Sequence, residues 1–119
     1  KILKENPAAV KAFLSAFAKG VKAVISDQAG AIETVKARDG IINVPLEQRR
    51  LKLAIDTVIN SPDAHTEGFG QINPGRMALM ASQVSDSFAT KTRVNPAAVW
   101  DGSFLPTKAE LNVLPAQKK

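Results

Sequence analysis

The 119-residue sequence contains no cysteine and a single histidine, His65. Without cysteine, the chain can form no disulfide, thiolate nucleophile or cysteine-ligated metal site. His65 stands between Asp63 and Glu67, but no second histidine exists to complete a zinc-type site. The sequence also lacks a nucleophile signature that would predict a Ser-His-acid triad with His65. We therefore predict no metal and no cofactor, and interpret His65 as an exposed loop residue.

Long apolar segments are also missing from the chain. Every apolar run is far shorter than the ~20 residues that a helix needs to cross a bilayer. Lys1 and Lys4 precede an amphipathic stretch, whereas a secretory signal would continue into an apolar one. Because an initiator methionine is lacking as well, we expect a processed or truncated piece, so the missing signal says nothing about where its parent resides.

Aromatic residues make up only 5% of the chain, while apolar residues as a whole make up 45%. This apolar share is ordinary for a globular protein and too high for disorder. With few aromatics, the core must be built mainly from Ala, Val, Leu and Ile. The length suits one domain. We predict a single helical domain over residues 1–115, with a frayed tail over 116–119.

The net charge of +5 is spread thinly along the sequence. Residues 1–60 hold ten Lys and Arg against six Asp and Glu, and residues 61–119 hold six against five. A nucleic-acid site more often concentrates basic residues in a stripe with interleaved aromatics. We therefore expect a solvated basic surface and no nucleic-acid partner. A small basic nucleic-acid-binding module is the alternative, motivated by the isoelectric point near 9.8.

Helical periodicity dominates the sequence, and no stretch alternates long enough to predict a strand. Asn-Pro pairs open three helices, because Asn caps free N–H groups and Pro fits the first helical position. The predicted fold class is mainly α, with about five helices and short extended connectors, one of them at 41–44. We expect helices from Asn6 to Ile25, from Asp27 to a stop at Gly40, over 45–60, from Asn73 to about Thr90, and from Asn95 to Trp100. A capping box at 107–110 predicts one last turn.

The helix predicted at 45–60 is apolar on two sides. Leu51 and Ile55 lie on one face, whereas Leu46 and Leu53 project from nearly the opposite side. A helix of this kind needs two neighbours, and we expect the chain to supply only one. We therefore predict exposed apolar surface and self-association. The alternative is a helical scaffold or adaptor that binds a partner through Leu46 and Leu53.

Two residues are candidates for ligand binding. Arg76 falls in the first turn of the helix that begins at Asn73, where a guanidinium and a helix N-terminus could together hold an anion. Trp100, the only tryptophan, could line a ligand cleft. The competing interpretations are a surface arginine and a tryptophan that anchors the tail in a core.

Two further groups have simpler explanations. Arg49, Arg50 and Lys52 could touch an acidic partner, but the two arginines point in different directions on a helix. The Gly68-Phe69-Gly70 segment is too short for a phosphate loop and follows no strand. We expect its glycines to serve turn geometry, with Phe69 packed inward.

Taken in order, several segments resemble the C-terminal part of ABC-transporter substrate-binding proteins, of the family that binds nitrate, sulfonates and thiamine-precursor pyrimidines. The similarity runs over nearly the whole chain, and the order of the segments carries it. The last segment is similar to the family's tail, where an aromatic residue and an Asp come shortly before Phe-Leu-Pro. The matching segments are Glu5 to Phe13, the Ala- and Val-rich helix that ends near Asp27, Ala31 to Val35, Leu46 to Ile59, Gly70 to Pro74, and Val99 to Pro106.

This resemblance implies the C-terminal helical segments of a two-lobed α/β periplasmic binding protein of type II. It implies a protein in the periplasm or anchored outside the cell by a lipid, which captures a small solute by lobe closure and delivers it to an ABC permease. The solute would be an anion or a small heterocycle. No family ligand residue is carried over to this chain, and the cysteine-rich motif of the similar thiamine-pyrimidine enzymes has no counterpart here. We therefore expect no catalytic activity.

Overall fold

Most of the backbone in the computed structural model, which describes residues 1–116, is helical, and no strand occurs within this range. The predicted mainly α fold class is confirmed, although the helices are more numerous than the five or so expected. A π-helical turn and two short 3₁₀ helices add to the α-helices. The elements are α1 (Ile2–Glu5), α2 (Pro7–Ser26), α3 (Gln28–Arg38), α4 (Val44–Ala54), η1 (Ile55–Ile59), α5 (Pro62–Thr66), α6 (Pro74–Ser87), η2 (Pro96–Ala98), η3 (Gly102–Phe104) and α7 (Lys108–Leu111).

The predicted start signals act through side-chain caps. Each capping oxygen accepts a hydrogen bond from a backbone N–H group in the first turn, a group that would otherwise lack a partner. At α7 the capping box is complete, since the cap and the third helical residue bond each other's backbone. The caps are Asn6 at α2, Asp27 at α3, Asn73 at α6, Asn95 at η2 and Thr107 at α7.

Between the helices predicted over 45–60 and from Asn73 we expected no further helix, but this segment contains the short helix α5. Ser61 Oγ accepts a hydrogen bond from the Ala64 N–H group at 3.2 Å, and Pro62 occupies the first helical position. The pair that stops the preceding helix thus also starts the next one. The connector expected at 41–44 is also shorter than predicted, because the Asn43 side chain caps α4 from Val44 onward.

The C-terminal end of α4 widens into the π-helical turn η1. Here the N–H group of Asn60 donates to the carbonyl oxygen of Ile55 at 2.7 Å, a bond that spans five residues. The wider turn holds Ile55 buried and Ile59 half-buried. Ile59 packs against the main core, so the turn directs the end of this long helix toward the C-terminal segment.

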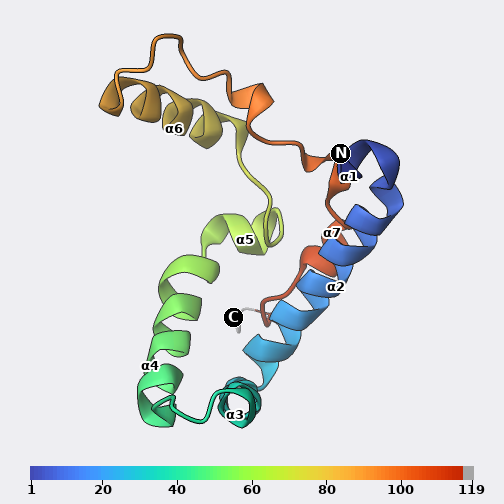
Figure 1. The fold of residues 1–119 in the computed structure, drawn as a ribbon, viewed down its shortest axis with the longest axis vertical. Helices are drawn as coiled ribbons and strands as arrows, with labels where there is room; N and C mark the ends of the chain where they lie inside the picture. The colour runs from blue at the N-terminus through green and yellow to red at the C-terminus, as the bar shows by residue number, and fades with distance from the viewer. Residues whose placement is uncertain (117–119) are drawn as a thin grey trace.

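The helices are arranged as an open curve rather than a closed bundle (Figure 1). Helix α2 runs along one side, α3 crosses at its end, α4 returns on the other side, and α6 projects away beyond α5. The Cα radius of gyration is 17.4 Å, whereas a compact chain of this length has about 13.5 Å. The accessible surface is 8969 Å², against about 6,200 Å² for a compact monomer of this mass.

The main core lies where the C-terminal segment crosses α2. Leu111 and Val113, each 2% exposed, pack there with Ala18 of α2 and with Leu114. The N–H group of Phe69 donates to the Leu111 carbonyl at 2.9 Å, which ties the loop after α5 to the same point. Of the tail predicted at 116–119, Ala116 is exposed and residues 117–119 lie outside the described range.

Large apolar side chains remain exposed along the open curve. Phe13 is 67% exposed and Phe17 54% on α2, and Leu53 is 63% exposed on α4. The prediction of exposed apolar surface is therefore confirmed. Leu46, the other half of the predicted scaffold pair, is half-buried. Within residues 1–116, no helix has both the length and the apolar character that crossing a membrane requires.

Candidate functional site

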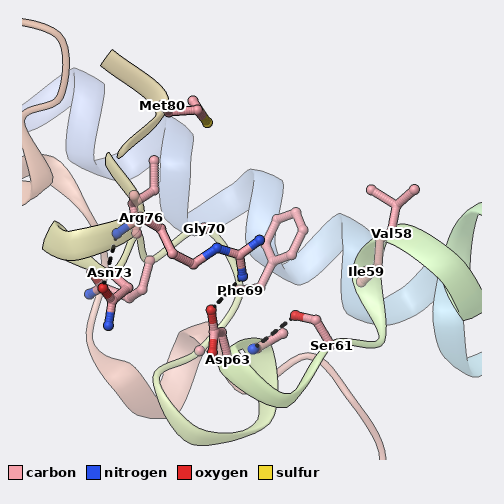
Figure 2. Close-up of a pocket in the computed structure, with 13 residues that line it drawn as sticks. Val58, Ile59, Ser61, Asp63, Phe69, Gly70, Asn73, Arg76 and Met80 are labelled. Atoms are coloured by element: carbon pink, nitrogen blue, oxygen red, sulfur yellow. Dashed lines mark hydrogen bonds and ion pairs between the residues drawn. The ribbon is translucent and has the colours of Figure 1, made fainter. Parts of the chain in front are cut away.

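A pocket of about 300 Å³ opens between η1, α5 and the base of α6. Its apolar wall comes from Val58 and Ile59 on one side and from Met80 on the other, with Phe69 between them in the lining. Polar groups come from the N-terminal ends of α5 and α6. Figure 2 shows Arg76 extending from α6 toward Asp63 of α5.

The Arg76 guanidinium is already paired with a carboxylate. Its Nη1 lies 2.7 Å from Oδ2 of Asp63, and the two side chains are 74% and 45% exposed. Exposed pairs of this kind are held weakly, by about 0–1 kcal/mol. The guanidinium can therefore exchange Asp63 for another carboxylate, sulfonate or phosphate oxygen, or it can bind such a group through its remaining N–H donors.

The N-terminus of α6 has fewer free N–H donors for an anion than its sequence suggested. Oδ1 of Asn73 accepts hydrogen bonds from the N–H groups of Gly75 at 2.9 Å and of Arg76 at 3.2 Å. These are donors that an anion at the helix end would otherwise use. Arg76 therefore contributes to the pocket through its side chain rather than through the helix terminus.

Trp100, the other predicted ligand residue, does not line this pocket. It follows η2 and is 37% exposed. Its indole Nε1 lies beside Gly102, where an added Cβ would stand 3.3 Å away. Next to it, the Ser103 side chain and N–H group lower the pKa of Asp101 by hydrogen bonding. The structure therefore places Arg76 at this pocket, whereas Trp100 lies elsewhere, and the two candidate residues do not form one site.

His65 is not the exposed loop residue that we expected. It lies in α5, is half-buried, and its Nε2 is 2.7 Å from Oδ1 of Asn60. The flanking Asp63 instead points to Arg76. No cluster of three or more His, Cys, Asp or Glu side chains suited to a metal ion occurs within residues 1–116.

The remaining candidates have structural partners. Arg50 pairs with Glu47 at 2.7 Å, and Lys52 pairs with Asp56 one turn along the same helix, so two of the three basic residues on α4 have partners there. The Gly68-Phe69-Gly70 segment is confirmed as a turn with Phe69 packed inward. Gly68 has φ +101° and Gly70 φ +86°, and the Phe69 ring stacks on Phe17 at 6.4 Å.

Sequence reasoning missed a second hollow, which lies along α2. It comprises a cavity of about 660 Å³ bordered by α2, α3 and α4, and one of about 310 Å³ between α2 and the α4–η1 helix. The two share Val24 and Leu51 and form one groove. We call it the α2–α4 groove and define it by Phe17, Val21, Val24, Val35, Leu51 and Ile55. The spacing of Phe17, Val21 and Val24 in the sequence places them on one side of α2, but no local pattern shows whether another element covers them.

No protein-family model, curated protein or solved structure matches this chain.

Proposed function

We propose that this chain is the C-terminal portion of a solute-binding component of an ABC importer. It would contribute to the structure of a lobe, to ligand capture and to delivery of the solute to a permease. Such a component works outside the cytoplasm, in the periplasm or on a lipid anchor, and carries out no chemical step. The proposal rests on the ordered segments described above, which resemble this family.

The observation that best supports the proposal is the open architecture. The accessible surface exceeds that of a compact monomer by about 2,700 Å². Among the described residues only eight apolar side chains are buried. Helices with this much uncovered apolar surface are what one expects of a layer that packs against a further body of protein.

The tail of the chain fits the same role. The segment that resembles the family's aromatic-Asp and Phe-Leu-Pro tail returns from α6 and lies against α2, with η3 and α7 both in contact with that helix. Leu105 packs against the core around Leu111. Through these contacts the segment around Leu105 and Leu111 packs against α2.

Two measurements test this function. The coding DNA before Lys1 should encode an α/β lobe and an export signal. The polypeptide read from that DNA should then bind nitrate, an alkyl sulfonate or an aminopyrimidine in isothermal titration calorimetry. Absence of the α/β lobe, or no binding of any of the three solute classes, would overturn the proposal.

Variants of that polypeptide test whether the pocket takes part. If the solute anion contacts Arg76, Arg76→Gln should weaken binding by about 10- to 100-fold, the loss of one charge-assisted hydrogen bond of about 1.5–3 kcal/mol. Arg50→Gln is the matched control, since Arg50 is also an exposed, ion-paired arginine but lies on α4. Equal effects of the two substitutions would exclude Arg76 as a ligand residue.

A further inference from the structure

We propose that the 119-residue chain pairs with a second copy of itself, with α6 of each copy lying in the α2–α4 groove of the other. This proposal concerns the 119-residue chain alone in solution and does not depend on the solute-binding proposal; in the longer protein of that proposal, the preceding lobe would cover the same surface instead. It begins from the size of the uncovered surface. The excess over a compact monomer, about 2,700 Å² per chain, is some three times the ~800 Å² that each partner contributes to a standard interface.

The groove presents an apolar floor that a helix can cover. Its cavities of about 660 and 310 Å³ share Val24 and Leu51, and together they line α2 from Phe17 to Asp27, about 15 Å along the helix. Phe17 and Val35 on its borders are 54% and 48% exposed. The groove therefore has the length and the apolar character of a helix-docking site.

Helix α6 has a matching apolar edge. Met80, Val84 and Phe88 follow one another at intervals of four residues and so lie on one face, which we call the α6 stripe. They are 54%, 42% and 77% exposed. The stripe adjoins the buried side of α6, where Met77 and Ala81 lie, and forms the uncovered edge of that apolar side. From Met80 to Phe88 the stripe is about 12 Å long, so it fits within the roughly 15 Å of α2 that lines the groove.

Charge favours α6 over α2 as the helix that enters the groove. Helix α2 carries three lysines and no acidic residue, so a second α2 in the groove would add a net charge of +3 beside the first, although the lysines lie on the side away from the groove. Helix α6 carries one arginine and one aspartate and is neutral overall. A neutral helix lying beside α2 avoids that repulsion.

The chain's own α6 is poorly placed to fill its own groove. The N–H group of Phe69 is bonded to Leu111, and only four residues separate Phe69 from Pro74, the first residue of α6. This anchor fixes the base of α6 near α5, and the helix projects away from α3 and α4 (Figure 1). A reciprocal exchange between two copies covers both grooves with one twofold axis, the commonest arrangement of soluble dimers.

Size-exclusion chromatography with multi-angle light scattering tests the pairing. The wild-type chain should have twice the monomer mass at micromolar concentration, and the dissociation constant should stay level or fall as NaCl screens the +5 charge of each copy. A chain that stays monomeric at all concentrations would overturn the proposal. This holds whether that monomer keeps the open shape or closes to a radius of gyration near 13.5 Å. Association that weakens with salt would also overturn it, because it would indicate an ionic contact.

Three aspartate substitutions locate the interface. Val84→Asp on the α6 stripe and Val35→Asp at the groove should each raise the dissociation constant at least about tenfold. Ile41→Asp changes the charge equally at a turn residue that is 92% exposed and outside both surfaces, and it should leave pairing unchanged. Circular dichroism must show wild-type helicity for all three variants. Equal weakening by all three would contradict the proposed interface.

Mixing the two interface variants gives the sharpest test. A Val84→Asp copy keeps an intact groove, and a Val35→Asp copy keeps an intact α6 stripe. A mixture should therefore form a heterodimer through one intact contact, tighter than either variant's homodimer. Lack of this recovery would show that the two surfaces do not bind each other.

Discussion

Gly68 should be the least replaceable glycine of the described chain. It is buried, its φ is +101°, and a Cβ added there would lie 2.8 Å from Cβ of Leu111, at the centre of the core. Alanine at this position therefore meets two costs. Strain of the backbone in a glycine conformation costs about 1–3 kcal/mol. The steric clash with a well-packed core residue costs about another 1–3 kcal/mol.

Two other glycines separate these costs. Gly70 also has a positive φ, +86°, but the nearest atom to an added Cβ is 3.8 Å away on Leu105. Gly70→Ala should therefore lose only the strain contribution, about 1–3 kcal/mol. Gly20 lies inside α2 with nothing within 4 Å of an added Cβ. Gly20→Ala should stabilise the chain by about 0.5–1 kcal/mol, through helix propensity.

Urea unfolding followed by circular dichroism measures all three variants. With a slope of about 2 kcal/mol per M, Gly68→Ala should lower the midpoint by about 1–3 M, and further than Gly70→Ala does. Protein concentration must be held constant, because self-association adds to the apparent stability. Equal midpoints for Gly68→Ala and Gly70→Ala would refute the close contact with Leu111, and an unchanged midpoint for both would refute the positive φ angles.

Two further predictions concern the core and its edge. Leu111→Ala should cost about 2–5 kcal/mol of unfolding free energy, because it leaves a cavity at the centre of a small core. Leu53→Ala, at an exposed site, should change the unfolding free energy by less than about 0.5 kcal/mol. A similar cost for both variants would contradict the assigned core. Hydrogen bonds donated first by the Ser15 hydroxyl and then by Thr107 hold the pKa of Glu110 below its ordinary value, so its ionised form stabilises the folded chain. This contribution to stability is present above about pH 4.3 and is lost as the pH falls through the folded-state pKa of Glu110. The urea midpoints of wild type and Glu110→Gln should therefore converge in acid. A constant difference between them down to about pH 2 would show that ionised Glu110 does not stabilise the folded chain.

The helix starts were predictable because a capping signal is local. Asn6, Asp27 and Asn73 each act on an N–H group two or three residues away, so the sequence alone contains both partners of the hydrogen bond. The helix α5 was missed although Ser61 and Pro62 form the same kind of signal. They directly follow the end of the preceding helix, so the same two residues both end one helix and start the next.

The pocket and the groove were not predictable, because they depend on which elements meet. The sequence predicts an apolar stripe on α2, but not that Ala18 would be 2% exposed while Phe17 beside it is 54% exposed. That difference arises because α7 and the C-terminal segment cross α2 at one point and leave the neighbouring surface open. Likewise, the ion pair of Arg76 with Asp63 joins residues from two helices whose relative placement no local pattern determines.

The π-helical turn at Ile55–Ile59 makes this stretch tolerant of a change in chain length. A turn closed by the bond from Asn60 to Ile55 accommodates one residue more than an α-helical turn. Removing one residue inside it would leave a regular α-helix, with α5 in nearly its original orientation. Removing one residue elsewhere in α4 would instead rotate everything downstream by about 100° about the helix axis. Homologous chains that differ by a single residue in length should therefore gain or lose that residue between positions 55 and 59.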